Sequence, residues 1–264
     1  MKSPDQNSIG FFDSGIGGTS IWKEVIDLLP HENTIYVADG KNAPYGQQSK
    51  DKIIELCIKN TEFLLNYNVK AIIVACNTAT TNAIQVLRSK YSIPFIGIEP
   101  AIKPAGLITK TQRIGILATE RTLNSRLFEK TSEKLDPRIE IIEQNGKGLV
   151  NMIEAGHIDT PEIQSLLHQY IQPMLQKNID VLVLGCTHYP YLIPIIKKII
   201  GEDIKIVDSS VAVAKQTKHI LDKFSLLNLE STSKPKYLFF SNTHSKVLSK
   251  LLKNSSVKII EKTF

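Results

Sequence analysis

Short apolar runs alternate with longer amphipathic stretches along most of the 264-residue chain. Runs such as 71–75 are apolar at every position, which is typical of strands buried on both faces of a parallel sheet. The runs that predict strands are 9–12, 34–38, 71–75, 94–98, 113–118, 139–143, 181–185 and 204–208. Their regular alternation with helical patterns predicts an α/β fold.

The stretches between these runs carry apolar residues at helical spacing. Residues 51–66 and 161–176 predict crossover helices, and Pro161 takes a first-turn position directly after Thr160, where proline is favoured. The tail 250–264 predicts a helix followed by a short strand.

One segment of the chain recurs in altered form. "VKAIIVACNTATT" at 69–81 aligns without gaps on "IDVLVLGCTHYP" at 179–190, so that Cys76 falls on Cys186. Upstream, "SIGFFDSG" from Ser8 has a weaker echo in "RIGILATE" from Arg113. We interpret the repeat as two related α/β lobes, 1–98 with 209–264 and 99–208. The chain crosses between them at "GIEPAIKPAG" and near "IVDSS", where proline, glycine and serine favour loops.

The composition is that of an ordinary globular protein, with 42% hydrophobic and 22% charged residues. No apolar run reaches the roughly 18 residues that span a bilayer, and the first residues lack the apolar core of a signal peptide, so we expect a cytoplasmic protein without a membrane partner. The three cysteines include no CxxC pair, which predicts thiols rather than disulfides. The net charge of +6 is spread along the chain, and no nucleic-acid-binding pattern accompanies it.

Two of the cysteines stand where ligands gather in parallel α/β proteins, at the carboxyl ends of strands. Cys76 and Cys186 each follow a predicted buried strand, and a helix N-terminus at such a position stabilises a thiolate. Two thiols facing one cleft from separate lobes could remove a proton from one side of a carbon and return one to the other side. Cys57 lies inside a predicted helix, and we assign it to packing.

Further polar residues lie near these positions in the sequence. Asp13 at the end of the first strand and His188, two residues beyond Cys186, are candidates to adjust the acidity of the thiols. "DSGIGG" at 13–18 places glycines where a strand becomes a helix, which suits close approach of an anion, although the P-loop pattern is missing. "APYGQQS" at 43–49 predicts a turn with an exposed Tyr45.

The motifs "FDSGIGG", "PYG", "CNTAT", "PAIKPA" and "GCTHYP" occur in this order between Ile9 and about Phe224. In these motifs the chain resembles the glutamate racemase family of the aspartate/glutamate racemase superfamily. The resemblance implies two pseudo-symmetric, doubly wound parallel-sheet lobes with the active site in the cleft between them. It also implies that L- and D-glutamate are interconverted for peptidoglycan synthesis without cofactor or metal, and it allows a homodimer.

The resemblance also implies residue roles. Cys76 would act on D-glutamate and Cys186 on L-glutamate, with Asp13, His188 and Glu154 assisting the thiols. Substrate contacts are implied for Asp13, Ser14, Pro44, Tyr45, Gly46, Asn77, Thr78, Thr187 and His188. Two positions depart from the common family pattern, Asn42 where many members have arginine and Arg121 where a small residue is common.

Other functions stay open at this point. Aspartate racemases, or racemases of another amino or carboxylic acid, share the two-thiol plan, but resembling aspartate enzymes tend to read Cys-Thr-Glu where this chain has Cys186, Thr187 and His188. An enzyme with Cys76, Cys186 and His188 as zinc ligands is a second alternative, weakened by the poor C-x-H ligand spacing. A two-lobed carboxylate-binding protein is a third, but it leaves the paired cysteines unexplained.

Overall fold

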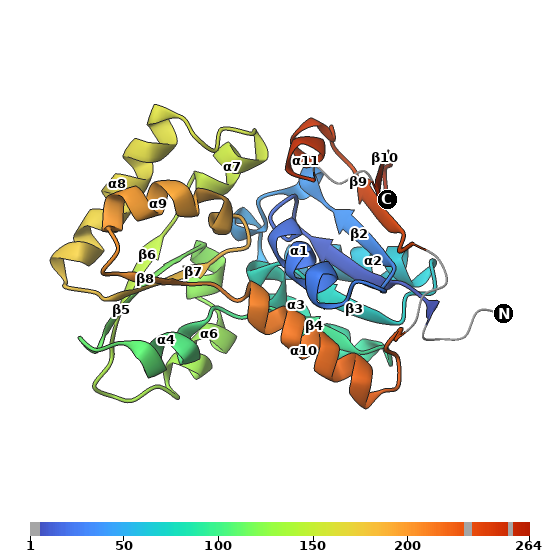
Figure 1. Ribbon diagram of the computed structural model, residues 1–264, viewed down its shortest axis with the longest axis horizontal. Helices are drawn as coiled ribbons and strands as arrows, with labels where there is room; N and C mark the ends of the chain where they lie inside the picture. The colour runs from blue at the N-terminus through green and yellow to red at the C-terminus, as the bar shows by residue number, and fades with distance from the viewer. Residues whose placement is uncertain (1–5, 230–233, 253–255) are drawn as a thin grey trace.

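The computed structural model describes residues 6–229, 234–252 and 256–264, which form two lobes side by side (Figure 1). Each lobe is built around its own sheet, and every strand pairing in both sheets is parallel. The first sheet has the order β10-β9-β2-β1-β3-β4 and the second β6-β5-β7-β8. The first contains β1 (Ile9–Asp13), β2 (Thr34–Ala38), β3 (Ala71–Val74), β4 (Phe95–Gly97), β9 (Tyr237–Ser241) and β10 (Val257–Glu261). The second contains β5 (Arg113–Ala118), β6 (Glu140–Asn145), β7 (Val181–Gly185) and β8 (Lys205–Val207). The predicted fold class is confirmed.

The two sheets share one strand order over four strands. The order β2-β1-β3-β4 of the first lobe corresponds strand for strand to β6-β5-β7-β8 of the second. Cys76 follows β3 and Cys186 follows β7, which are equivalent strands in this correspondence. The repeat in the sequence is therefore a structural repeat, and β9 and β10 extend only the first copy.

Helices cover both faces of each sheet. The first lobe has α1 (Thr19–Leu28), α2 (Lys50–Leu65), α3 (Asn77–Lys90), α10 (Ser210–Lys223) and α11 (Lys246–Leu251), with 3₁₀ turns η2 (Gly40–Asn42) and η3 (Tyr45–Gln47). The second has α4 (Ile102–Ile108), α5 (Glu120–Leu123), α6 (Arg126–Ser132), α7 (Leu149–Glu154), α8 (Pro161–Gln176) and α9 (Ile193–Ile200), with η4 (Tyr189–Leu192). The predicted helix 161–176 is confirmed, and Thr160 caps it by accepting the Ile163 amide. The described helices include none long and apolar enough to cross a membrane.

The return of the chain to the first lobe occurs after β8. Helix α10 packs against α1 and β4 of the first lobe, and β9 and β10 join the first sheet. We therefore propose the same lobe boundaries as from the sequence. The first lobe comprises 1–98 together with 209–264, and the second comprises 99–208.

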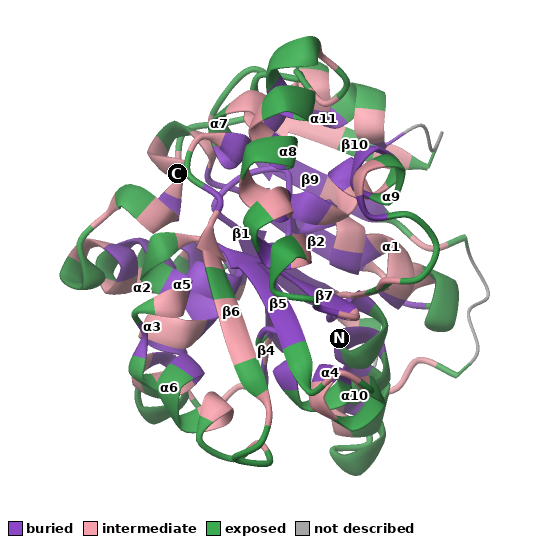
Figure 2. Ribbon diagram, turned by 90° about the vertical axis from the view of Figure 1, so that its left-hand side faces the viewer, coloured by how far each residue is buried: buried purple, intermediate pink, exposed green. Residues whose placement is uncertain are grey.

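Successive side chains of the central strands enter separate cores. In β1, Phe11 packs into the core under α1 and α10, whereas Phe12 packs into the core under α2 and α3. In β5, Leu117 and Ile116 are likewise divided between two cores. Figure 2 shows β1 and β5 buried over most of their length. Burial on both faces is why these runs are apolar at every position rather than at alternate ones.

Two features of the C-terminal region differ from the prediction. Strand β9 lies beside β2, where Trp22 meets Tyr237 and Phe239 edge to face, although its run "YLFF" is not among the predicted strands. Helix α11 ends at Leu251, so it lies mostly before the predicted tail helix, part of which falls on residues 253–255 outside the described ranges. Strand β10 confirms the predicted final strand.

Candidate active site

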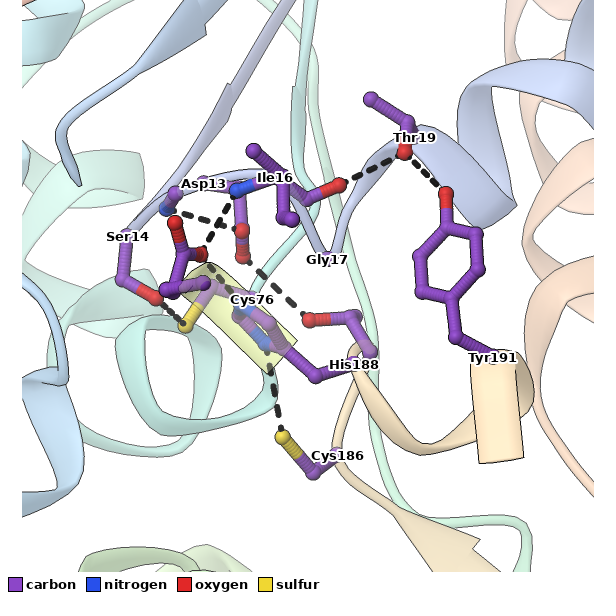
Figure 3. A network of polar contacts seen from close by, with 12 residues as sticks. Asp13, Ser14, Ile16, Gly17, Thr19, Cys76, Cys186, His188 and Tyr191 are labelled. Carbon is purple, nitrogen blue, oxygen red and sulfur yellow. Dashed lines mark hydrogen bonds and ion pairs between the residues drawn. The ribbon is translucent and has the colours of Figure 1, made fainter. Parts of the chain in front are cut away.

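The carboxyl ends of the two sheets meet at the interface between the lobes. Asp13 ends β1, Cys76 follows β3 and Cys186 follows β7, and their exposed fractions are 0%, 5% and 7%. Thr187 of the second lobe donates a hydrogen bond to Asp13 Oδ1 of the first at 3.3 Å. Figure 3 shows both thiols in this buried polar region. The topology therefore brings together the residues predicted to carry the chemistry.

Cys76 is the N-cap of helix α3. Its sulfur accepts the Ala79 amide at 3.5 Å, and the thiol donates to Ser14 Oγ at 3.8 Å. Burial raises the pKa of Cys76 well above its usual value, and the neighbouring Asp13 charge raises it further, while the Ala79 amide opposes this shift. At neutral pH Cys76 is consequently a thiol that needs a change in its surroundings to release its proton.

Cys186 begins a line of polar contacts that ends at Glu154. Its Sγ lies 3.7 Å from His188 Nδ1, and His188 Nε2 lies 2.5 Å from Glu154 Oε1. Burial by itself lowers the pKa of His188, but the contacts with Cys186 and Glu154 outweigh it and raise that pKa well above the usual value. An imidazolium held in this way stabilises negative charge on the neighbouring sulfur. The two thiols therefore lie in chemically different surroundings.

Asp13 is a carboxyl group shared by the two lobes. It accepts the Gly15 amide at 3.0 Å in addition to the Thr187 hydroxyl. Burial raises the pKa of Asp13, the His188 charge opposes this effect, and the Glu154 charge adds to it. Asp13 is thus suited to take up and release a proton.

The glycine-rich loop 13–18 is where the second lobe comes closest. A Cβ atom at Gly15 would lie 1.9 Å from Glu154 Oε1, and one at Gly17 would lie 2.3 Å from His188 Nδ1. The Ile16 amide donates to Glu154 Oε1 at 2.8 Å. The glycines are needed because these polar side chains occupy the space that a side chain would fill. The loop was predicted to bind an anion. In this structure its Gly15 amide binds the carboxylate of Asp13, and its Ile16 amide binds the carboxylate of Glu154.

The prediction of an exposed Tyr45 is wrong, because Tyr45 is only 1% exposed. Its hydroxyl donates to Asp39 Oδ2 at 2.6 Å and accepts from Asn60 Nδ2 at 3.0 Å, and these buried partners draw the ring inward. Pro44 and Gly46 on either side are half-buried. They line a cavity of about 110 Å³ together with second-lobe residues, among them Thr119 and Asn151.

Asn77 and Thr78 form the first turn of α3, and both are 3% exposed. Asn77 Oδ1 is buried without a hydrogen-bond partner among the described residues. A buried acceptor without a partner is costly unless a ligand or water satisfies it. This atom is therefore a candidate for contact with a hydrogen-bond donor on a substrate.

Comparison with known proteins agrees with this arrangement. The model of the Asp/Glu/Hydantoin racemase family matches residues 20–235. This chain belongs to that family. It is 42% identical to the glutamate racemase of Clostridium novyi over 246 residues, which cover 93% of this chain and 95% of the relative. The resemblance found in the sequence motifs is confirmed.

Two solved structures show how closely this racemase family member follows its relatives. Glutamate racemase from Francisella tularensis, in complex with D-glutamate, superposes with a TM-score of 0.83 at 33% identity, covering 97% of this chain and 98% of that one. Escherichia coli glutamate racemase, in complex with L-glutamate and the activator UDP-MurNAc-Ala, gives 0.84 at 29% identity and covers 97% of both chains.

Thr119 and Thr122, two threonines of the second lobe that lie beside the predicted Thr78, are absent from the sequence prediction. Thr78 Oγ1 lies 2.9 Å from Thr119 Oγ1 and 3.3 Å from Thr122 Oγ1, and the latter two are 3.0 Å apart. The weaker repeat contained a signal for the first of them, because Thr119 in "RIGILATE" aligns with Ser14 in "SIGFFDSG". The polar ends of β1 and β5 therefore both contribute to this region of the racemase.

Asp39 is a second residue that the sequence prediction missed. Besides the Tyr45 hydroxyl it accepts the side-chain amides of Asn42 at 2.8 Å and Asn242 at 2.6 Å. Asn42, one of the two departures from the family pattern, therefore has a structural role beside the 43–46 turn. Arg121, the other departure, is exposed on α5.

The zinc alternative finds no support at this site. Both ring nitrogens of His188 already have partners, Cys186 at Nδ1 and Glu154 at Nε2. Within residues 6–229, 234–252 and 256–264, no group of three histidine, cysteine or acidic side chains is placed to hold a metal ion.

Proposed function

We propose that this racemase family member interconverts L- and D-glutamate with two cysteines, one of Cys76 and Cys186 removing the α-proton and the other returning a proton to the opposite face. The observation that carries the proposal is the placement of two buried thiols at equivalent strand ends of two similar lobes. The occurrence of D-glutamate in one related crystal structure and of L-glutamate in another supports the choice of substrate.

In the proposed reaction one cysteine thiolate first removes the α-proton, and the other cysteine, as a thiol, then donates its proton to the opposite face of the α-carbon. One carbon–hydrogen bond breaks and another forms, one sulfur gains a proton and the other loses one. The configuration inverts without any change of oxidation state. We assign Cys76 to the D-enantiomer and Cys186 to the L-enantiomer, as the family resemblance implies. The step requires neither cofactor nor metal.

The two sets of neighbours would serve the two thiols separately. We assign Asp13, whose charge acts on Cys76, to receive the proton that Cys76 must lose. His188 would stabilise the Cys186 thiolate, with Glu154 holding the imidazole ring by its other nitrogen. Because burial raises the pKa of Asp13, this carboxyl group can exchange a proton closer to neutral pH than an exposed aspartate can.

The substrate would be held by polar groups around the thiols. Asn77 Oδ1 is an acceptor for the α-ammonium group, because it has no hydrogen-bond partner among the described residues. Since the Tyr45 hydroxyl is bound to Asp39, we assign the substrate contact of the 44–46 turn to its backbone. The remaining proposed contacts with the carboxylates and ammonium are Asp13, Ser14, Pro44, Gly46, Thr78, Thr187 and His188.

The cellular role follows from the same resemblance. We propose that the product D-glutamate supplies peptidoglycan synthesis in the cytoplasm. Glutamate is the only partner that the proposed reaction needs, while a homodimer is a further proposal that sedimentation of the purified protein would test.

The direct test follows the α-proton and the configuration together. D-glutamate is incubated with the protein in deuterated water containing EDTA and no added cofactor, while NMR records loss of the α-proton signal and a polarimeter records optical rotation. We expect deuterium to replace the α-proton as the rotation decays to zero. Binding of glutamate without either change would instead indicate a carboxylate-binding protein.

Aspartate is expected to be a poor substrate. The residues Cys186, Thr187 and His188 match the glutamate pattern, so kcat/KM for aspartate should be lower than for glutamate by at least about 100-fold, or roughly 2.7 kcal/mol of transition-state discrimination. Initial rates with both amino acids measure this ratio. Comparable turnover would reassign the chain to an aspartate or broad-specificity racemase.

Replacing Asp13 by asparagine is expected to lower activity and to change the pH dependence of stability. We expect kcat/KM to fall by about 10²-fold, in the range for loss of a positioned acid–base group.

Because the folded-state pKa of Asp13 is raised, the folded parent binds more protons than the unfolded chain between the two pKa values. The parent's free energy of unfolding should therefore fall, relative to that of the variant, as pH rises from about 4 through the folded pKa. Urea titrations across this range measure the difference, and parallel curves would contradict the raised pKa.

A further inference from the structure

Tyr191 lies next to the proposed active site but has no place in the proposed reaction. It belongs to η4 of the second lobe, and its hydroxyl contacts Thr19 Oγ1 at the start of α1 in the first lobe (Figure 3). Burial raises the pKa of Tyr191 to about 12, so the hydroxyl keeps its proton at neutral pH. The Thr19 hydroxyl donates to the Ile16 carbonyl at 2.6 Å. Since each hydroxyl has a single hydrogen, Tyr191 is the donor and Thr19 Oγ1 the acceptor.

This contact closes a ring of hydrogen bonds that includes His188 and Glu154, the two residues proposed to assist Cys186. From Thr19 the ring continues through Ile16, whose amide donates to Glu154 Oε1 at 2.8 Å. Glu154 Oε1 lies 2.5 Å from His188 Nε2. The ring returns to its start because the Tyr191 amide donates to the His188 carbonyl at 3.2 Å. It crosses the interface between the lobes twice, at Thr19–Tyr191 and at Ile16–Glu154.

Neighbouring contacts hold the same two segments together. Ser20 Oγ lies 2.9 Å from the Gly17 carbonyl oxygen and 3.2 Å from the Thr187 carbonyl oxygen, and the Lys23 ammonium lies 5.7 Å from the centre of the Tyr191 ring. A Cβ atom at Gly17 would lie 2.3 Å from His188 Nδ1, so the loop before α1 packs directly on the imidazole ring. A change in the spacing between α1 and η4 would therefore shift His188 relative to Cys186.

We propose that Tyr191 is a positioning residue, whose hydrogen bond to Thr19 fixes the distance between the lobes at which His188 and Glu154 align with Cys186. This inference rests on the proposed function. It predicts that loss of the Tyr191 hydroxyl slows proton transfer at Cys186 more than at Cys76. The ring includes the neighbours of Cys186 and leaves out Ser14 and Ala79, which contact Cys76.

The test uses Tyr191→Phe, which removes only the hydroxyl and keeps the ring near Lys23. We expect kcat/KM for glutamate to fall about 3- to 30-fold, as for loss of one hydrogen bond that orients a catalytic group. Thr19→Val should have an effect at least as large, because it also removes the hydrogen bond to the Ile16 carbonyl, and the double variant should be little worse than Thr19→Val alone because both changes remove the Thr19–Tyr191 contact. Tyr91→Phe is the matched control, since it removes a tyrosine hydrogen bond to Glu62 on the surface of the first lobe.

Deuterium isotope effects distinguish positioning from general damage. If proton transfer at Cys186 slows, the isotope effect on kcat/KM should rise for α-deuterated L-glutamate and fall for α-deuterated D-glutamate in Tyr191→Phe. A smaller fraction of folded enzyme would change neither value. The proposal is overturned if both isotope effects stay at the parent values, if they move in the same direction, or if the two single variants add independently.

A second measurement separates this inference from the proposed function. In protein labelled with ¹⁵N at histidine, the proton between His188 Nε2 and Glu154 should give a strongly downfield NMR signal. We expect this signal in the parent and in Tyr91→Phe, and its broadening or shift in Tyr191→Phe and Thr19→Val. If the parent fails to racemise glutamate but the signal responds in this way, the proposed reaction is wrong and the positioning role of Tyr191 stands. An unchanged signal in Tyr191→Phe would overturn that role.

Discussion

Serine at position 76 or 186 is expected to lower kcat/KM for glutamate by roughly 10³-fold or more. Each thiol acts once in every proposed turnover, and a positioned general acid or base contributes about 10²- to 10⁴-fold. A serine hydroxyl is far less acidic than a thiol, so each variant loses one half of the proton relay. Racemisation should collapse in both Cys76→Ser and Cys186→Ser, as measured by polarimetry.

The proton exchange that remains should identify the face served by each thiol. With Cys76 intact, residual α-proton exchange in deuterated water should favour D-glutamate, and with Cys186 intact it should favour L-glutamate. Serine is nearly isosteric with cysteine, so circular dichroism should show a folded protein in both cases. A folded variant that racemises glutamate within tenfold of the parent rate would exclude the two-thiol reaction.

Cys57 provides the matched control for these variants. It is fully buried in α2, where burial raises the pKa of its thiol far above the usual range. Cys57→Ser should keep near-normal catalysis and lose at most some stability through packing, because no step of the proposed reaction uses this thiol. A large loss of activity with unchanged stability would place Cys57 in the reaction.

Lys70→Met is expected to lower the free energy of unfolding by about 3–5 kcal/mol, because it removes one partner of a buried ion pair. Lys70 Nζ lies 2.6 Å from Glu32 Oε2, and both side chains are 1% exposed. Glu32 Oε1 also accepts the Asn228 amide at 2.9 Å. Urea denaturation monitored by circular dichroism measures the loss.

Two further variants test the cause of that loss. Lys90 pairs with Glu62 at 3.2 Å, but these side chains are 46% and 56% exposed, so Lys90→Met should cost much less stability than Lys70→Met. Adding Glu32→Gln to Lys70→Met removes the buried charge while keeping an acceptor for Asn228, and should recover part of the stability. A loss in Lys70→Met no greater than in Lys90→Met would show that the buried pair contributes little.

The sequence was sufficient to place the two cysteines. Each follows an apolar run that only a doubly covered strand requires, and the gap-free repeat puts both at equivalent strand ends. The weaker echo upstream aligns Thr119 with Ser14, so the polar end of β5 could have been recognised as well. These inferences succeed because strand burial and strand order are written in local patterns.

The surroundings of each residue required the tertiary structure. A turn with proline and glycine predicted an exposed Tyr45, but Asp39 and Asn60 lie where they can bind its hydroxyl inside the lobe. Strand β9 takes its place beside β2 through its contacts with Trp22, which is more than 200 positions earlier in the chain. Neither arrangement has a signature in the neighbouring residues.

The sequence by itself determined an α/β protein of two related lobes with a thiol at the end of one equivalent strand in each. It did so because the apolar runs and their repeat depend on local burial, which the identity of each residue records directly. Only the tertiary structure decided that Cys186 lies beside a His188–Glu154 pair while Cys76 lies beside Ser14 and Ala79. It also decided that Thr19 meets Tyr191 across the lobes. These contacts join residues far apart in the chain, and their distances depend on how two separately packed lobes sit against each other, which no local pattern of residues encodes.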